Sequence, residues 1–148
     1  MASYRQIYYH IVFGTKYRQK TIPDEHCDKL YKYIWGIIKN KNCKLYRING
    51  SLDHLHIMSD LHPSIALADY LRTIKTSSSI WLKTQPEFPR FIGWAEGYAA
   101  FTISHSDRHR VIEYIKNQKE HHKKESFPVE YKRLLKEFDV DFDEKYFL

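Results

Sequence analysis

Two histidines two residues apart, in the segment GSLDHLHIM, are the residues of this sequence best placed to do chemistry. Side chains two apart in a strand point to the same face, so His54 and His56 would leave a sheet together while Leu55 and Ile57 face the core. Two imidazoles on one face provide half of a metal site. Asp53 could orient one of them from behind, or merely finish a turn. Such a pair also arises by chance roughly half the time at this histidine content, so two half-exposed strand histidines are the alternative.

A tyrosine and a glutamine four residues apart form the second group, in the segment YIKNQKEHHKK. Residues four apart share a helix face, so Tyr114 and Gln118 present a phenol and an amide oxygen side by side. Any one of the 12 tyrosines is more often a packing residue, which is the alternative for Tyr114. His121 and His122 follow about one turn later, where they are either auxiliary ligands or part of a solvated helix end beside the C-terminal dipole.

Together the two groups predict a reaction at phosphorus. Two neutral imidazoles and an amide oxygen suit a divalent ion with open positions, and such an ion can bind two non-bridging oxygens of a phosphodiester. The phenol beside the ion would be the nucleophile. A tyrosine that attacks phosphorus releases a 3′ hydroxyl and keeps the 5′ end bound covalently, which conserves the bond energy for rejoining to a different strand.

Hydrophobic periodicity predicts the elements that must position these groups. Runs rich in β-branched and aromatic residues indicate strands, and apolar residues at spacings of three and four indicate helices. A Ser/Thr cluster at 76–79 can interrupt the second helix. The expected elements are a strand at Tyr8–Thr15, a helix at Pro23–Asn40, strands at Lys44–Ile48 and His54–Leu61 joined by a turn at Asn49–Ser51, a helix after Pro63, a strand at Tyr98–Ser104, a helix from Asp107 through the HHKK segment, and a short helix at Pro128–Phe138.

This order predicts an α+β fold of the ferredoxin-like class, the split βαβ plan that RRM-like domains share. An antiparallel sheet would carry helices on one face, with the tyrosine-bearing helix added toward the C-terminus. The opposite face is then free for a ligand, for extra helices or for another subunit.

Composition limits the classes of function. A chain of 148 residues fits a single domain at 1–148, with an acidic and aromatic tail at 139–148. Lysine and arginine total 24 against 18 acidic residues, and the net charge of +6 favours nucleic acid as a partner. Cys27 and Cys43 are too few for a disulfide framework and lack a zinc spacing. Without an apolar run of about 18 residues or a secretory signal, a soluble cytoplasmic protein is expected.

Several motifs in a fixed order resemble those of a known family. They are YHIVFGTKYRQK, GSLDHLHIM, LRTIKTSSSIWL, GWAEGYAAFTIS, YIKNQKEHHKK and the ending EYKRLLKEF with FDEKY. Across nearly the whole chain, this set resembles the single-tyrosine HUH transposases of small insertion sequences, in which HUH stands for His-hydrophobe-His.

The resemblance implies a ferredoxin-like fold, a Mg²⁺ or Mn²⁺ ion and an obligate homodimer in a bacterial or archaeal cell. It implies an enzyme that cuts and rejoins single-stranded DNA at hairpin-bearing element ends. By residue matching, it implies that His54, His56 and Gln118 are metal ligands and that Tyr114 is the nucleophile. In that family the tyrosine helix of one subunit can complete the site of the other, so which chain delivers the tyrosine stays open.

Basic and hydroxyl side chains are the candidates for contacts with DNA, since a basic loop and a hydroxyl-rich helix end can hold phosphates. Tyr17, Tyr98 and Phe101 could stack on unpaired bases, although strand aromatics more often belong to the core. The acidic tail could pack against a partner subunit, shield the DNA groove or simply solubilise the chain. The candidates for phosphate contacts are Lys16, Arg18, Arg72, Lys75, Ser77 and Ser78.

Two other functions are alternatives. A related HUH nickase usually has a longer chain or further domains, and 148 residues argue against it. A non-catalytic ferredoxin-like module that binds nucleic acid is compatible with the aromatic-rich strands, but the RNP pattern of such modules is absent. A closed zinc site is disfavoured because its soft ligands are missing.

Overall fold

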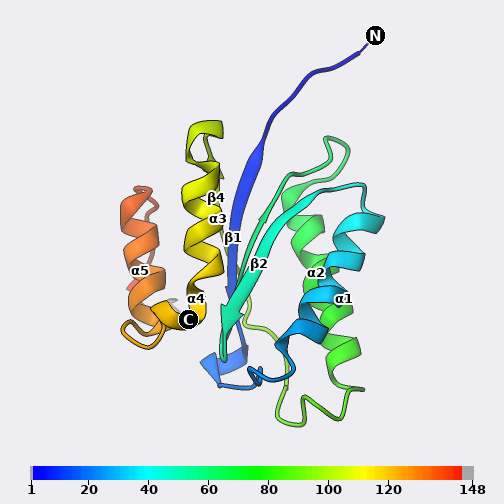
Figure 1. Cartoon of the computed structure of the whole chain (residues 1–148), viewed down its shortest axis with the longest axis vertical. Coiled ribbons are helices and arrows are strands. Elements are labelled where there is room, and N and C mark those ends of the chain that lie inside the picture. The colour runs from blue at the N-terminus through cyan, green and yellow to red at the C-terminus, as the bar shows by residue number, and fades with distance from the viewer. Residues whose placement is uncertain (1, 145–148) are drawn as a thin grey trace.

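A four-stranded antiparallel sheet forms the centre of the molecule in a computed structural model that describes residues 2–144 (Figure 1). The strands lie in the order β2-β3-β1-β4, so the strand that carries the two histidines has a neighbour on each side. The bounds are Tyr8–Gly14 for β1, Leu45–Ser51 for β2, His54–Ser59 for β3 and Ala99–Ile103 for β4.

Helices cover both faces of this sheet (Figure 1). α1 and α2 pack on one face, while α3, α4 and α5 lie on the other. Within residues 2–144, no helix is both long and apolar enough to cross a membrane. The bounds are Cys27–Asn40 for α1, Leu67–Leu82 for α2, Arg108–Lys116 for α3, Gln118–His121 for α4 and Phe127–Glu137 for α5, with short 3-10 turns η1 at Lys16–Arg18 and η2 at His105–Asp107.

The architecture confirms the predicted α+β, ferredoxin-like class. β1 and β3 are the central strands and α1 and α2 cross over the same face, as the split βαβ plan requires. Of the three occupants that the sequence allows for the second face, the structure shows extra helices, α3 to α5, from the same chain.

Alternation along β1 and β3 decides which side chains meet which helices. Ile11, Leu55 and Ile57 are fully buried in the cluster that also contains the apolar stripes of α1 and α2. Burial of each such side chain contributes about 1.5–3 kcal/mol, so this layer fixes the sheet. His54 and His56 point to the other face, as their spacing predicts, and contact side chains of α4 and α5 there.

The hairpin that presents the histidines turns later than predicted. The sequence predicts the turn at Asn49–Ser51, but these residues belong to β2, and the turn consists of Leu52 and Asp53. A Cβ added at Gly50 would lie 2.1 Å from the carbonyl oxygen of His54, so only glycine permits this close approach of the strands. The glycine serves strand pairing and not the turn.

Two helix predictions also differ from the structure. α2 runs unbroken through the Ser/Thr cluster, because the Ser78 hydroxyl donates to the carbonyl of Ile74 at 2.6 Å and accepts from the Trp94 indole at 2.9 Å. The helix predicted from Asp107 through HHKK is broken at Asn117, where α3 ends and α4 begins. Tyr114 and Gln118 therefore lie on two successive helices and not on one.

Candidate active site on the second face of the sheet

The two β3 histidines are fully buried and oriented by hydrogen bonds. Nδ1 of His54 lies 2.8 Å from a carboxylate oxygen of Asp53, and Nδ1 of His56 lies 2.8 Å from Nε2 of His10 on β1. A partner at Nδ1 fixes the orientation of each ring and leaves Nε2 for another group. Asp53 thus orients His54 and also belongs to the turn, so it fills both of the roles that the sequence allows.

A buried carboxylate lies where the imidazoles converge. Oε1 of Glu130 is 3.4 Å from Nε2 of His54, 3.1 Å from Nε2 of His56 and 2.9 Å from Nε2 of His122. Glu130 comes from α5 and is fully buried. The Nε2 atoms of three rings from β3 and the end of α4 therefore face one oxygen from a third element.

Tyr114 and Gln118 join the same centre. The amide oxygen of Gln118 lies 3.1 Å from Nε2 of His54, while its amide nitrogen donates to Oε2 of Glu130 at 3.0 Å. The Tyr114 hydroxyl donates to the same Oε2, and its ring centroid is 5.8 Å from that of His56. The structure thus brings together, within one chain, all four residues that the sequence assigns to ligand and nucleophile roles.

The break between α3 and α4 is held against the sheet. The Asn49 amide on β2 donates to the carbonyl of Lys116 at 2.9 Å, and Nζ of Lys119 donates to the carbonyl of Gly50 at 3.2 Å. Val111 and Ile115 of α3 pack with Met58 of β3 in one apolar cluster. The end of α3 and the start of α4 are therefore fixed next to the β2-β3 hairpin that presents the histidines.

α5 forms over the histidine pair for local reasons. The Ser126 side chain accepts from the backbone N–H of Val129, and Pro128 occupies the first turn, as suits a helix start. Phe127 stacks on His54 with ring centroids 4.1 Å apart, and this contact needs Gly14, where a Cβ would lie 2.7 Å from the Phe127 ring. The phenyl ring therefore excludes water from one side of the imidazole.

The electrostatics distinguish the imidazoles. Burial lowers the pKa of His10 and brings that of His56 to about 4, so both rings are neutral near pH 7. Burial also acts to lower the pKa of His54, but hydrogen bonds to Asp53 and Glu130 outweigh it and raise this pKa to about 8. Burial would raise the pKa of Glu130, yet the surrounding imidazoles hold it well below its usual value. Glu130 is therefore ionised beside His54.

The donor set fits a divalent metal ion. His54, His56, His122 and Glu130 each bring one ligand atom within 4.8 Å of the others. Imidazole nitrogen suits transition metals, and carboxylate or amide oxygen suits Mg²⁺ and Mn²⁺. The mixed set of nitrogen and oxygen donors therefore suits a divalent cation.

The two histidines that follow Gln118 have different surroundings. The His122 side chain is 6% exposed and faces Glu130, so it belongs to the buried cluster. The His121 side chain is 30% exposed, and its Nε2 lies 2.6 Å from a Glu125 oxygen. The reading of both as a solvated helix end is wrong for His122.

Glu130 and His10 were not among the predicted site residues, although each left a signal. Glu130 lies within the apolar stripe of α5, formed by Phe127, Tyr131 and Leu134, and a carboxylate at such a position is buried only with partners. His10 alternates with Val12 on β1, which places it on the same face as the histidine pair. The charged residue within the apolar stripe, Glu130, was therefore a stronger sign of a buried site than the alternation that places His10.

The predicted DNA contacts divide between two places. Lys16 and Arg18 lie in η1, directly after β1, where Gly14 pairs with His54. Arg72 and Ser77 lie on α2, in the layer on the other side of the sheet from the histidines. Only the first pair is close to the candidate site.

Two of the α2 candidates are already engaged inside the protein. Ser78 is fully buried, with its hydroxyl bound to Ile74 and Trp94. Nζ of Lys75 donates to the carbonyls of Ala95 and Gly97 at 2.7 and 2.9 Å. Both side chains stabilise the fold in this way, and we expect no phosphate contact from Ser78.

The acidic tail approaches the basic turn. Asp141, Phe142 and Asp143 line a groove of about 880 Å³ together with Lys16 and Arg18. Tyr17 is 74% exposed beside this groove, and Tyr98 also lines it. Phe101, the third predicted stacking residue, is buried on β4. Tail residues 145–148 lie outside the described residues.

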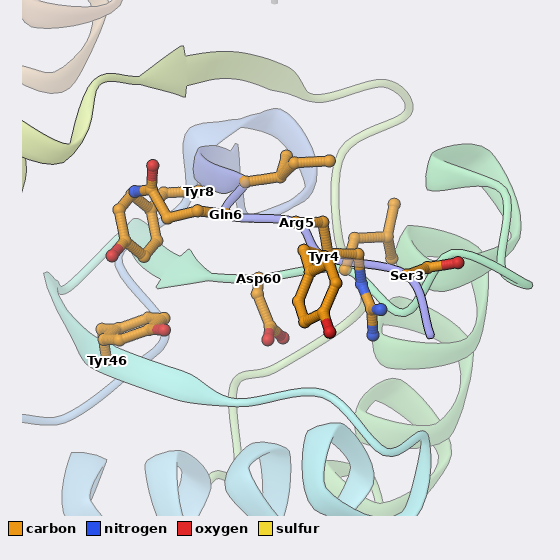
Figure 2. A pocket seen from close by; sticks show the side chains of 9 residues that line it. Ser3, Tyr4, Arg5, Gln6, Tyr8, Tyr46 and Asp60 are labelled. Atoms are coloured by element: carbon orange, nitrogen blue, oxygen red, sulfur yellow. The ribbon is translucent and has the colours of Figure 1, made fainter. Parts of the chain in front are cut away.

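A separate hollow lies at the other end of the sheet, near the start of β1. It has a volume of about 390 Å³ and is lined by residues 3–8 with Tyr46, Asp60 and Leu61. Figure 2 shows Tyr4, Asp60 and Tyr46 along this hollow. None of the residues that line it belongs to the histidine cluster, so it takes no part in the candidate site.

Comparison with known proteins gives consistent matches. Residues 3–118 match the family model described as IS200-like transposase. The transposase of insertion sequence element IS200 from Salmonella typhimurium is 26% identical over 120 residues, which cover 78% of each chain. The ISDra2 transposase TnpA of Deinococcus radiodurans is 24% identical over 118 residues, covering 76% of this chain and 84% of that protein.

Two solved structures share the fold. A transposase candidate from Deinococcus radiodurans superposes with a TM-score of 0.58 at 25% identity, covering 80% of this chain and 95% of the other. A REP-associated tyrosine transposase bound to a REP hairpin gives a TM-score of 0.62 at 14% identity, covering 82% and 74%. The second likeness concerns the fold alone.

Proposed function

The chain belongs to the IS200-like family of transposases, and we propose that it cleaves and rejoins single-stranded DNA through a covalent bond between Tyr114 and a 5′ phosphate. The observation that carries this proposal is the meeting of Tyr114 with the β3 histidines and Glu130 inside one chain. A phenol beside a cluster of ligands for a cation is an arrangement that supports phosphoryl transfer to tyrosine.

The metal site would consist of His54, His56 and Gln118, as the resemblance implies, with His122 and Glu130 added from the C-terminal part of the chain. A divalent ion bound there would polarise the scissile phosphate and offset its developing negative charge. Asp53 and His10 would hold the two β3 rings in the orientation that directs Nε2 to the ion.

Glu130 would link the ion site to the nucleophile. One of its oxygens faces three imidazoles, and the other accepts the hydrogen bond of Tyr114. The phenolic proton can therefore pass from Oη of Tyr114 to Oε2 of Glu130 as the phenol oxygen attacks phosphorus. The 3′ oxygen is the leaving group, and the 5′ phosphate stays on the tyrosine.

The exposed edge of this site beside Tyr114 suits single-stranded DNA. The ligand side chains are buried, whereas Arg133 and His121 beside Tyr114 are 40% and 30% exposed. A flexible strand can bring one phosphate to such an edge more easily than a stiff duplex can. We expect Lys16 and Arg18 to hold flanking phosphates, with Tyr17 stacking on a base.

The homodimer that the resemblance implies is part of this proposal. Because one chain holds both the histidine pair and the tyrosine, the second copy would contribute DNA-binding surface and a second site, and not the missing half of the first. The relatives come from bacteria, so we place the reaction in a bacterial cytoplasm, where the DNA is.

The test is formation of a covalent adduct. Wild-type protein, a labelled single-stranded oligonucleotide carrying a hairpin from the DNA that flanks the gene, and Mn²⁺ or Mg²⁺ should give a band that survives denaturation. Tyr114→Phe should abolish it. Tyr33→Phe, a control on the opposite layer where Tyr33 stacks on Trp81, should leave it unchanged. An adduct that persists in Tyr114→Phe, or no adduct with wild type, would refute the proposal.

A further inference from the structure

The Tyr114 hydroxyl lies between two opposite charges, both supplied by α5. It donates to Oε2 of Glu130 and accepts from Nη2 of Arg133 at 2.8 Å. We propose that Arg133 is a catalytic residue that stabilises negative charge on the Tyr114 oxygen, both when the tyrosine attacks and when it leaves. This inference rests on the proposed function, because it requires Tyr114 to be the nucleophile.

Arg133 is held in position for this role. Its Nε and Nη2 donate to Glu125 at 3.2 and 3.0 Å, and Nη1 lies 3.7 Å from a Glu137 oxygen. The guanidinium carbon lies 5.7 Å from the centroid of the Tyr114 ring. Because the planar fork is already fixed by carboxylates, little side-chain freedom is lost when Nη2 holds the phenol oxygen.

Proton transfer to Glu130 leaves negative charge on the phenol oxygen. Nη2 of Arg133 is a donor to this same oxygen, at 2.8 Å. That charge is stabilised when a positive group lies within hydrogen-bond distance of the oxygen. Arg133 meets this requirement at the oxygen that reacts.

The charge arises in both directions of the reaction. In cleavage, the bond from Oη to phosphorus forms while the bond from phosphorus to the 3′ oxygen breaks. The phenolic proton goes to Glu130, the 3′ oxygen leaves with its electron pair and takes a proton from water, and the proton on Glu130 then neutralises the hydroxide that this leaves. In rejoining, a 3′ hydroxyl oxygen attacks phosphorus and gives its proton to water, and Oη leaves with the electron pair, so the departing phenolate faces Arg133 before it takes a proton from water.

Arg133 and its partner Glu125 lie outside the part of the chain that matches the family model. That match ends at residue 118, whereas Arg133 and Glu125 lie on and just before α5. The inference therefore concerns a device of the C-terminal helix of this chain. Two roles for α5 can be distinguished in this way. A helix that only restrained the tyrosine would slow the reaction, whereas a helix that supplies Arg133 as a catalytic residue would speed it.

The first experiment measures single-turnover adduct formation at saturating DNA. Arg133→Ala should lower the rate by about 100-fold, the typical cost of removing one donor to a developing oxyanion, with DNA affinity unchanged. Arg133→Lys should retain part of the rate, because a point charge replaces the fork. Lys136→Ala removes an exposed charge from the same helix and should leave the rate unchanged. Equal thermal stability of the variants excludes unfolding as the cause.

The second experiment separates catalysis from packing. Incorporation of 3,5-difluorotyrosine at position 114 makes the phenol more acidic, so it should restore about 10-fold or more of the rate lost in Arg133→Ala. Millimolar guanidinium, but not tetramethylammonium, should also restore activity. A merely structural Arg133 would respond to neither.

The outcomes distinguish this inference from the proposed function. A wild-type adduct that requires Tyr114, together with an unchanged or increased rate in Arg133→Ala, overturns the inference alone; an increased rate would identify α5 as a restraint. Loss of rate without rescue by difluorotyrosine or guanidinium also overturns it. Absence of any Tyr114-dependent adduct in wild type overturns the proposed function instead.

Discussion

The candidate site has two halves that are positioned by different means. In the sheet half, His54 and His56 are fixed by backbone pairing with β1 and β2 on both sides of β3. In the helical half, Tyr114, Gln118 and Glu130 come from three successive helices and meet through side-chain hydrogen bonds. A central strand cannot shift without breaking two ladders, whereas a helix can move by exchanging side-chain partners.

This difference matches the roles proposed for the two halves, which are ion binding for the sheet half and nucleophilic attack for the helical half. Groups that hold an ion need a constant geometry, which the strands supply. The proposed nucleophile, Tyr114, would have to change partners in each cycle, and the helical half permits this. The family match ends at Gln118, so it covers the sheet half together with Tyr114 and Gln118 and leaves His122, Glu130 and Arg133 outside it. The predictions below test whether both halves belong to one site.

The largest effect is expected from the sheet half. His56→Ala removes a proposed ligand whose backbone is fixed by strand pairing on both sides of β3. We expect Mn²⁺ affinity to fall by more than about 100-fold, since loss of an outer partner alone costs roughly 10- to 100-fold. Calorimetric titration of Mn²⁺ measures this, with His109→Ala on the exposed face of α3 as control. Unchanged affinity would place the ion elsewhere.

The helical half is tested by Glu130→Gln, which keeps the shape of the side chain and removes its charge. We expect Mn²⁺ affinity to fall by about 10- to 100-fold, and adduct formation to fall with it, because Oε1 faces three imidazoles and Oε2 faces Tyr114. Glu120→Gln on exposed α4 is the matched control. If only the adduct rate falls, Glu130 serves the tyrosine and not the ion.

A smaller effect is expected from the support of the sheet half. Asp53→Asn keeps a hydrogen-bond acceptor near Nδ1 of His54 but removes the charge that favours this orientation. We expect about a 10-fold loss of Mn²⁺ affinity, at the low end for an outer partner. Asp69→Asn on the exposed face of α2 should bind Mn²⁺ like wild type. A loss as large as that of His56→Ala would mean that Asp53 itself binds the ion.

The smallest effect concerns the tail. Deletion of residues 139–148 removes four carboxylates and one lysine, and Asp141 and Asp143 share a groove with Lys16 and Arg18. We expect DNA affinity at low salt to rise a few-fold, with the difference vanishing at high salt because the interaction is screened. Fluorescence anisotropy at two salt concentrations measures it. Equal affinities at low salt would mean that the tail does not shield the groove.

The fold was more predictable than the full site. Periodicity identified the four strands and the order of helices, and the His-x-His spacing set the face of both rings, because a strand has a fixed two-residue repeat. The turn at Leu52–Asp53 and the break at Asn117 were missed, because each depends on a close tertiary contact, at Gly50 and at Asn49.

Glu130 was missed for a related reason. Its helix was expected, but nothing local to EYKRLLKEF says which element that helix covers. The contact between His56 and Glu130 joins residues that are 74 positions apart in the sequence, and tertiary packing decides such a contact. A carboxylate within an apolar stripe was the clue, and it indicates burial without naming the partner.

The account rests on assembly of one complete site within one chain, and mixing two inactive variants tests this most directly. His54→Ala lacks the sheet half, and Tyr114→Phe lacks the helical half. If each chain uses its own tyrosine, an equimolar mixture that has been unfolded and refolded together stays without covalent adduct, while wild type refolded alone recovers it. Adduct formation in the mixture would show that the tyrosine of one chain serves the histidines of another, and would contradict the account.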